Sequence, residues 1–289
     1  MLPQENDIRP VNAPLLLGRY QPINLIGRGG SSLVFRGTDV TLGRDVAIKI
    51  SRPGIDPEDY KKELRVLAGL SHHGVISIVD AGIDTYAPAD PRPFLVMELV
   101  RGQTVGDTLR MRPLTTREIG GIGYEVAEAL DYVHSQGVIH RDISPANIML
   151  TDYGTSTARP RARITDFGIA IDHSIERDSE VRRSAMAYAS PEQAEGRALT
   201  PASDIYSLGL VLLKCFTTEG ASSDADADAE TALARLESGP DIPKSVPKPW
   251  RKLIREMTSR EIFDRPTAAK VQSGIRAILR RDKSVARAS

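Results

Sequence analysis

The most informative stretch for the fold is "HRDISPANIML", residues 140–150, which ends in an apolar run. Asp142 and Asn147 lie five positions apart in it, a spacing at which a loop can aim a carboxylate and an amide into one site. Ser144 lies between them and carries no charge. The stretch is therefore compatible with an intact catalytic loop, a weakened one or a relic.

Length and charge limit the classes of protein. A chain of 289 residues fits two domains or one bilobal unit with a substantial core. Lys plus Arg and Asp plus Glu both number 38, so no basic field favours nucleic acid or an anionic membrane. The single cysteine, Cys215, excludes an internal disulfide and favours a reducing compartment. It lies in the apolar run "SLGLVLLKCF", which predicts a small buried side chain rather than a nucleophile.

The N-terminal segment does not read as a targeting sequence. It carries acids before any apolar run and only three consecutive leucines, unlike a signal peptide. No window approaches the roughly 18 apolar residues of a membrane span. We expect a soluble, cytoplasmic protein with no membrane segment in this chain, or a piece of a longer, membrane-anchored parent.

Short apolar runs predict a small first lobe. From "YQPINLIGRGGSSLVFRGTD" through "RDVAIKIS", runs punctuated by Gly predict three strands in hairpin order. "PEDYKKELRVLAGLSHH" has leucines at helical spacing and predicts a helix. "VISIVDAGI" and "FLVMELV" predict two more strands. Residues 1–17 read as a tail or as an arm packed on the domain.

After Gly102 the pattern becomes mostly helical. "TTREIGGIGYEVAEALDYVHSQG" begins with Thr caps and stops at Gly137. "SDIYSLGLVLLKCFTTEG" is apolar on nearly every face and predicts a buried helix. "PWRKLIREMTS" and "TAAKVQSGIRAILRR" predict amphipathic closing helices. "SSDADADAE" predicts a solvated acidic loop rather than a metal site, because alternation does not make side chains converge.

Two features of the first lobe suit a phosphate. Glycines in "GRGGSSLVF" let the backbone approach a phosphate closely, although a flexible hairpin has the same composition. "VAIK" alternates as a strand that ends at Lys49. Glu63 on the following helix could turn toward it, with Glu58 as the competing partner. A Lys held by a carboxylate is a fixed charge suited to bridging phosphates.

A third acidic position follows the short predicted strand "ARIT". Asp166 lies there, ahead of a Gly turn in "RITDFGIA". Taken singly, Asp before Gly is a common turn and His140 could be a packed core histidine. The order of these features is more specific: a Gly-rich hairpin, VAIK, a helical Glu, HRD-x₄-N, DFG and then "SPEQ". That order resembles the eukaryotic-type protein kinase family, and "GRGG", "SPEQ" and "SDIYSLG" are most similar to its bacterial Ser/Thr branch.

The resemblance covers residues 18 to about 280 and implies an α+β, bilobal protein kinase fold. It implies a five-stranded antiparallel N-lobe with one helix and a larger, mostly helical C-lobe. The implied boundaries are a tail at 1–17, an N-lobe at 18–97, a hinge at 98–102, a C-lobe at 103–280 and a tail at 281–289.

The resemblance also implies catalytic roles. Lys49 would contact the α- and β-phosphates of ATP, with Glu63 as its ion-pair partner. Asp142 would accept the proton of the substrate hydroxyl, and Asn147 and Asp166 would bind Mg²⁺ or Mn²⁺. These residue types suit the chemistry, because the metal needs hard oxygen ligands and phosphoryl transfer needs charge neutralisation.

For the adenine, the resemblance implies an apolar slot and a bonded edge. Val34 and Ala47 would lie on one side and Met149 on the other. Met97 would lie behind the ring as the gatekeeper. The remaining residues implied to bind the nucleotide are Gly27, Gly29 and Gly30 of the Gly-rich loop and the backbone of Glu98 and Val100 in "MELV".

Three positions depart from the family pattern. Ser32 replaces the third Gly of the loop and keeps a small side chain. Ser144 replaces a lysine that contacts the γ-phosphate, and Ala185 replaces the threonine that bonds this lysine. A charged hydrogen bond contributes roughly 1.5–3 kcal/mol, so its loss slows transfer by about ten- to a few hundred-fold. We expect a slower enzyme rather than a dead one, and Pro145, which tyrosine kinases lack, favours Ser/Thr specificity.

Two further implications concern stability and regulation. Glu192 of "SPEQ" and Arg265 of "FDRP" resemble the buried ion pair of the family, whose breakage costs on the order of 3–5 kcal/mol. Arg141 marks kinases in which a phosphate orders the activation loop. The candidate phosphorylation sites there are Ser179, which we favour, Ser174 and Ser184.

The expected function is an ATP- and Mg²⁺-dependent protein Ser/Thr kinase. It would phosphorylate itself, as a homodimer acting in trans, and at least one protein partner. Two alternatives remain open. One is a nucleotide-binding pseudokinase or weakly active scaffold, and the other is a small-molecule phosphotransferase, which "SPEQ" and the long activation segment disfavour.

Overall fold

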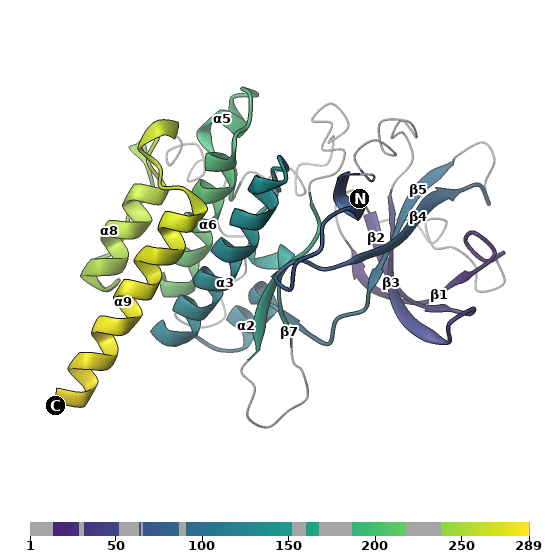
Figure 1. Ribbon diagram of the computed structural model, residues 1–289, viewed down its shortest axis with the longest axis horizontal. Coiled ribbons are helices and arrows are strands. Elements are labelled where there is room, and N and C mark those ends of the chain that lie inside the picture. The colour runs from purple at the N-terminus through teal and green to yellow at the C-terminus, as the bar shows by residue number, and fades with distance from the viewer. Residues whose placement is uncertain are drawn as a thin grey trace. The chain divides into compact units, whose positions relative to one another are not determined.

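The computed structural model describes residues 14–28, 32–51, 64, 66–86, 91–151, 160–167, 187–217 and 238–288. The chain divides into two units (Figure 1). The first unit comprises Met1–Ser71 and Ile76–Val100, and the second comprises His72–Val75 and Arg101–Ser289. His72–Val75 therefore belong with the second unit, although both segments that flank them belong to the first.

The first unit contains the five-stranded antiparallel sheet that the sequence predicts. Its strands are arranged in the order β1-β2-β3-β5-β4. The fourth strand begins three residues later than "VISIVDAGI" suggests, and the predicted helix is described only at residues 64 and 66–68. The strands are β1 (Tyr20–Arg28), β2 (Ser32–Asp39), β3 (Arg44–Ser51), β4 (Ile78–Asp84) and β5 (Arg92–Glu98).

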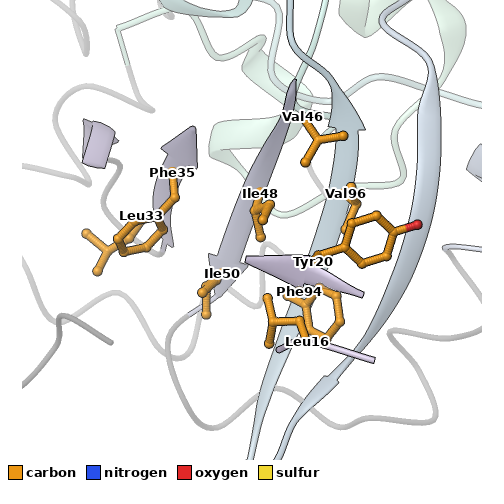
Figure 2. Packing of buried hydrophobic residues seen from close by; sticks show 9 residues of the cluster. All are labelled: Leu16, Tyr20, Leu33, Phe35, Val46, Ile48, Ile50, Phe94 and Val96. Atoms are coloured by element: carbon orange, nitrogen blue, oxygen red, sulfur yellow. The ribbon is translucent and has the colours of Figure 1, made fainter. Parts of the chain in front are cut away.

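One face of this sheet is buried in a hydrophobic core (Figure 2). Val46, Ile48 and Ile50 alternate along β3 and all point into it, as a period of two requires. Leu16 joins the same core with 2% of its surface exposed, so residues ahead of Gly18 include a packed arm. Fully burying a side chain of this size stabilises the fold by roughly 1.5–3 kcal/mol.

The second unit is mostly helical, as predicted. Its 20-residue helix α3 begins with a capping box between Thr115 and Glu118. The chain leaves that helix through Gly137, whose φ of 72° favours glycine. The helices are α2 (Val105–Met111), α3 (Thr116–Ser135), α5 (Pro191–Ala194), α6 (Pro201–Thr217), α8 (Lys248–Met257) and α9 (Ala268–Ala288), with 3₁₀ turns η2 (Pro145–Asn147) and η4 (Ile262–Asp264).

Helices α3, α6, α8 and α9 pack beside one another (Figure 1). Gly120 lets α3 approach α9 closely, because a Cβ there would come within 2.7 Å of Leu279 Cδ2. Helix α6 is buried on nearly every face, as its composition predicts. Cys215 lies in it as a buried free thiol, which confirms the expected packing role.

A second, three-stranded sheet lies in this unit, and the sequence predicted only one of its strands, the run "ARIT". It comprises β6 (Gly102–Thr104), β7 (Ile148–Thr151) and β8 (Arg161–Ile164), in the order β6-β7-β8. Runs of three or four residues are too short to show a period of two in the sequence. Within the described residues, no helix is both long and apolar enough to cross a membrane.

Candidate active site

The residues expected to bind the nucleotide in the first unit share one face of the sheet. Residues paired across antiparallel strands point to the same side, and neighbours along a strand alternate. Gly27 pairs with Val34 and Val34 with Lys49, while Ala47 pairs with Met97. All five therefore lie on the face of the sheet opposite the hydrophobic core.

The burial of these residues suits an apolar slot with one charge beside it. Ala47 and Met97 are 8% and 6% exposed, whereas Lys49 is half-buried. A Cβ on Gly27 would lie 3.4 Å from the Cβ of Val34, which is ordinary van der Waals contact. Three of the expected residues lie outside the described part of the chain: Gly29, Gly30 and Glu63.

The expected hinge begins at Glu98, the last residue of β5. Its backbone N–H donates to the carbonyl of Ser77 at 3.0 Å, and its Oε1 accepts from the N–H of Ser77 at 2.7 Å. A hydrogen bond from adenine to the backbone of Glu98 would therefore have to reach its carbonyl. Val100 follows as a half-buried residue.

In the second unit, the pairing of β7 with β8 brings two of the expected metal ligands close together. Asn147 directly precedes β7, and Asp166 follows β8 by two residues. The strands are antiparallel with Ile148 opposite Ile164, and the N–H of Thr165 donates to the carbonyl of Asn147 at 3.0 Å. These adjacent strand ends place Asn147 beside the turn that carries Asp166, and Met149 follows as a half-buried residue of β7.

A direct hydrogen bond joins Asn147 to Asp142. The Nδ2 of Asn147 donates to the carboxylate Oδ2 of Asp142 at 2.7 Å and to its backbone carbonyl at 2.8 Å. Because both amide hydrogens point to Asp142, the amide oxygen of Asn147 remains the acceptor end of the side chain. The spacing of five residues thus does what the sequence suggested and brings a carboxylate and an amide together.

These oxygen groups fit a magnesium ion that also binds phosphate. Mg²⁺ typically takes one or two protein carboxylates and completes its shell with water and phosphate oxygens. Within the described residues, no group of three or more His, Cys, Asp and Glu side chains could hold a metal alone. A site formed by Asp166 and the amide oxygen of Asn147 therefore suits a metal that arrives with a nucleotide.

His140 is a buried, neutral support of the loop. Its Nδ1 accepts the N–H of Asp142 at 3.3 Å, so its Nε2 carries the proton and donates to the carbonyl of Thr165 at 3.0 Å. Burial lowers the pKa of His140, which keeps the ring neutral. The ring also packs against Phe167, with centroids 4.5 Å apart. A packed histidine, the simplest sequence interpretation, is therefore correct.

Asp204 on α6 is a supporting residue that the sequence interpretation missed. Its carboxylate accepts the N–H of His140 at 2.8 Å, the N–H of Arg141 at 2.9 Å and a hydrogen bond from His134 Nε2 at 2.8 Å. The side chain is 1% exposed, and a buried carboxylate is stable only when it is paired. The available signal was an acid in "SDIYSLG", inside a helix that is otherwise apolar on nearly every face.

Two residues of the site have a strained backbone. Arg141 has φ of 71° and Asp166 has φ of 58°, in the left-handed region that non-glycine residues rarely adopt. Such residues cost of order 1–3 kcal/mol and persist only where surrounding contacts fix them. Here the carboxylate of Asp204 and the pairing of β7 with β8 supply those contacts.

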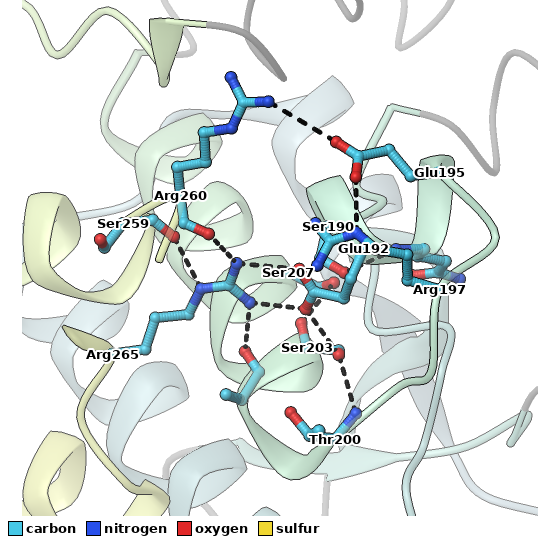
Figure 3. Close-up of polar contacts among 12 residues, drawn as sticks. Ser190, Glu192, Glu195, Arg197, Thr200, Ser203, Ser207, Ser259, Arg260 and Arg265 are labelled. Carbon is cyan, nitrogen blue, oxygen red and sulfur yellow. Dashed lines mark hydrogen bonds and ion pairs between the residues drawn. The ribbon is translucent and has the colours of Figure 1, made fainter. Parts of the chain in front are cut away.

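The ion pair expected between Glu192 and Arg265 is confirmed (Figure 3). Both side chains are fully buried, and the two Nη atoms of Arg265 reach the two carboxylate oxygens at 2.7 and 3.0 Å. Burial alone raises the pKa of Glu192, but hydrogen bonds from Arg265 and Ser203 outweigh it and hold the pKa at about 2. The other three N–H donors of Arg265 bond the carbonyls of Ala202, Ser259 and Arg260.

The departures from the family pattern are only partly visible. Ser144 precedes η2, and its side chain makes no capping hydrogen bond there. Ser32 is buried at the start of β2. Four predicted positions lie outside the described residues: Ala185 and the candidate phosphorylation sites Ser174, Ser179 and Ser184.

Comparison with known proteins agrees with this geometry. Residues 20–274 match the family described as protein kinase domain. The chain belongs to the protein kinase family. Its two-unit division, five-stranded sheet and largely helical second unit are those expected of a protein kinase domain.

Three similar curated proteins come from bacteria. A probable serine/threonine-protein kinase PknB of Bifidobacterium longum is 32% identical over 87% of this chain and 38% of that protein. Serine/threonine-protein kinase PknK of Mycobacterium tuberculosis is 34% identical over 94% and 25%. A DNA damage-responsive serine/threonine-protein kinase RqkA of Deinococcus radiodurans is 32% identical over 93% and 40%. The chain thus spans well under half the length of each relative.

Proposed function

We propose that this protein kinase domain transfers the γ-phosphate of ATP to Ser or Thr hydroxyls of proteins. The observation that carries the proposal is the hydrogen bond from Asn147 to Asp142, next to the strand ends that present Asp166. This contact supports the assignment of Asp142 as the general base and of Asn147 and Asp166 as the oxygen ligands of a metal. The residues of the first unit that are expected to bind the nucleotide are proposed to contact the same ATP molecule.

Each group has a distinct part in the nucleotide-binding face. Val34, Ala47 and Met97 supply apolar surface for the adenine, and Gly27, which has no side chain, leaves its backbone open to the phosphates. Lys49 supplies a positive charge for the α- and β-phosphates. The roles of Gly29, Gly30 and Glu63, and of the backbone of Glu98 and Val100, remain part of the proposal on the strength of the family pattern. Met149 of the second unit completes the adenine contacts.

The reaction needs one proton acceptor and neutralised phosphates. Asp142 accepts the proton of the substrate hydroxyl as that oxygen bonds to the γ-phosphorus and the bond to the bridging oxygen of ADP breaks. Asn147 fixes the direction of the Asp142 carboxylate through its amide. Asn147 and Asp166 would hold a magnesium ion, which would supply positive charge to neutralise the phosphates.

Two observations support Ser/Thr specificity, and one supports an active enzyme. The three relatives above bear names of serine/threonine-protein kinases. Pro145 opens η2 directly after Ser144, in the place where the sequence pattern differs from tyrosine kinases. Asp142, Asn147, Asp166 and Lys49 are all present, which favours an enzyme over a pseudokinase that only binds nucleotide.

The proposal extends to partners and location. The protein substrates carry Ser or Thr, one of them being the activation segment of the chain itself. A homodimer phosphorylates that segment in trans. Ser179 is the favoured site, and Ser174 and Ser184 are the other candidates. The protein works in the cytoplasm.

The deciding experiment incubates the protein with γ-labelled ATP and Mg²⁺. Wild type is compared with Lys49→Met and Asp142→Asn, and nucleotide binding is measured on the same samples. We expect label on wild-type protein and at least a hundredfold less on either variant. Bound nucleotide without label on wild type would instead support the pseudokinase.

A further inference from the structure

The peptide bond between Arg141 and Asp142 is held at both of its edges. Its carbonyl oxygen accepts a hydrogen bond from the Nε2 of Gln193 at 2.8 Å. Its N–H, which belongs to Asp142, donates to His140 Nδ1 at 3.3 Å. A peptide group is planar, so partners on opposite edges fix the orientation of the whole plane and the direction in which Asp142 leaves it.

The contact from Gln193 bonds the carbonyl of a residue whose backbone is strained. Arg141 is an exposed residue, so packing does not fix it, and its φ of 71° is unfavourable for a side chain that has a Cβ. Asp204 holds the N–H of Arg141 at 2.9 Å. Gln193 donates to the carbonyl of the same residue, so hydrogen bonds fix the strained backbone on both sides of the Arg141 Cα.

Gln193 lies in a short helix that a buried ion pair holds in place. It lies in α5 directly after Glu192, whose buried carboxylate pairs with Arg265. Ser190 caps the same helix and accepts the N–H of Gln193 at 3.4 Å. The Gln193 side chain, which contacts the loop that carries Asp142, therefore belongs to a short helix whose position is fixed by a buried ion pair.

We infer that Gln193 is a positioning residue that orients the Asp142 carboxylate through the Arg141 carbonyl. The inference rests on the proposed function, because it assigns Asp142 the part of general base. Gln193 touches neither substrate nor nucleotide in this account. It couples the seating of α5, fixed by the Glu192–Arg265 pair, to the direction of the base.

The first test replaces Gln193 with Met, which has nearly the same length and no N–H donor. We expect kcat to fall roughly three- to tenfold, the equivalent of one neutral hydrogen bond, with the KM for ATP unchanged. Amide hydrogen exchange in a peptide covering residues 140–143 should become faster by a similar factor. Gln136→Met is the matched control, because the Gln136 side chain is exposed and donates to the hydroxyl of its neighbour Ser135, while its backbone N–H, which caps α3, is kept in the variant.

A second variant separates positioning from a general loss of structure. Glu at position 193 presents a carboxylate to the Arg141 carbonyl at neutral pH, whereas its protonated form can donate again. The ratio of kcat for Gln193→Glu to that of wild type should therefore rise as the pH falls from 8 toward 5. The same ratio for Gln193→Met should stay flat, and both variants should unfold at the wild-type temperature.

The outcomes distinguish this inference from the proposed function. If wild type transfers no phosphate, the proposed function fails, and exchange in residues 140–143 decides the positioning role alone. Faster exchange in Gln193→Met than in Gln136→Met supports the inference. Exchange and kcat equal to wild type in Gln193→Met, or a pH-independent ratio for Gln193→Glu, would overturn it.

Discussion

Asp204 accepts a hydrogen bond of 2.8 Å from the backbone N–H of His140, a residue 64 positions earlier in the chain. The same carboxylate holds the N–H of Arg141. A single buried acid on α6 thus fixes the start of the loop that carries Asp142. The geometry of the proposed base depends on a side chain that has no part in the chemistry.

Asp204→Asn should weaken this anchor without removing volume. An amide offers one oxygen where the carboxylate offers two, so one loop N–H loses its partner. We expect the free energy of unfolding to fall by about 1.5–3 kcal/mol, as for a hydrogen bond to a charged group, and kcat to fall at least tenfold. Urea unfolding and steady-state kinetics measure the two effects, with the exposed Asp131→Asn as control. Full activity in Asp204→Asn would disprove the anchoring role.

Arg265→Ala should be among the most destabilising changes in the second unit. It leaves the buried carboxylate of Glu192 without its counter-charge, which costs on the order of 3–5 kcal/mol. Arg260→Ala is the matched control, because that guanidinium is exposed and lies 3.8 Å from Glu195. The control should change stability by less than about 1 kcal/mol. Similar unfolding midpoints for the two variants would contradict the importance of the buried pair.

The same pair predicts how stability depends on pH. The pKa of Glu192 is lowered from 4.5 to about 2 in the folded protein, so its contribution is complete above pH 4.5 and is lost as the pH falls toward 2. The stability difference between wild type and Glu192→Gln should be constant from pH 7 to 6. It should shrink by about 1.4 kcal/mol between pH 6 and 3.5, measured by urea unfolding at each pH. A difference that stays constant over that range would show that Glu192 titrates normally.

Ser144→Lys should change the rate little. It restores the charge usual in the family, but Ala185 removes the hydroxyl with which that lysine normally bonds. Since the Ser144 side chain makes no capping hydrogen bond, the substitution should leave η2 intact. We expect kcat within about threefold of wild type and of Ser144→Ala. A rate increase of tenfold or more would mean that the two positions act independently.

Periodicity was sufficient to predict the larger elements. The five strands of the first unit and helices α3, α6, α8 and α9 all follow apolar spacing that local residues reinforce, such as the Thr115 cap. Two of the three short strands of the second sheet, β6 and β7, were missed because three or four residues carry no measurable period, whereas β8 was predicted at "ARIT". Their pairing depends on contacts between distant segments, which spacing along the chain does not encode.

For the site, the sequence predicted the reactive groups but not their supports. Asp142, Asn147 and Asp166 were recognised because their chemistry and order are distinctive. Asp204 and Gln193 were not, since each acts through a backbone atom of Arg141 and carries no catalytic signature of its own. Only the folded chain brings these two residues, 52 and 63 positions away in sequence, to the backbone of Arg141.

The central claim is that Asp142, aligned by Asn147, directs phosphate from ATP onto Ser or Thr hydroxyls. Its most direct test is phosphosite mapping by mass spectrometry after incubation with ATP and Mg²⁺, on wild type and on Asp142→Asn. We predict phosphoserine or phosphothreonine in the wild-type activation segment, Ser179 included, and at least a hundredfold lower occupancy in Asp142→Asn. Unmodified wild-type protein, or equal occupancy in Asp142→Asn, would contradict the account.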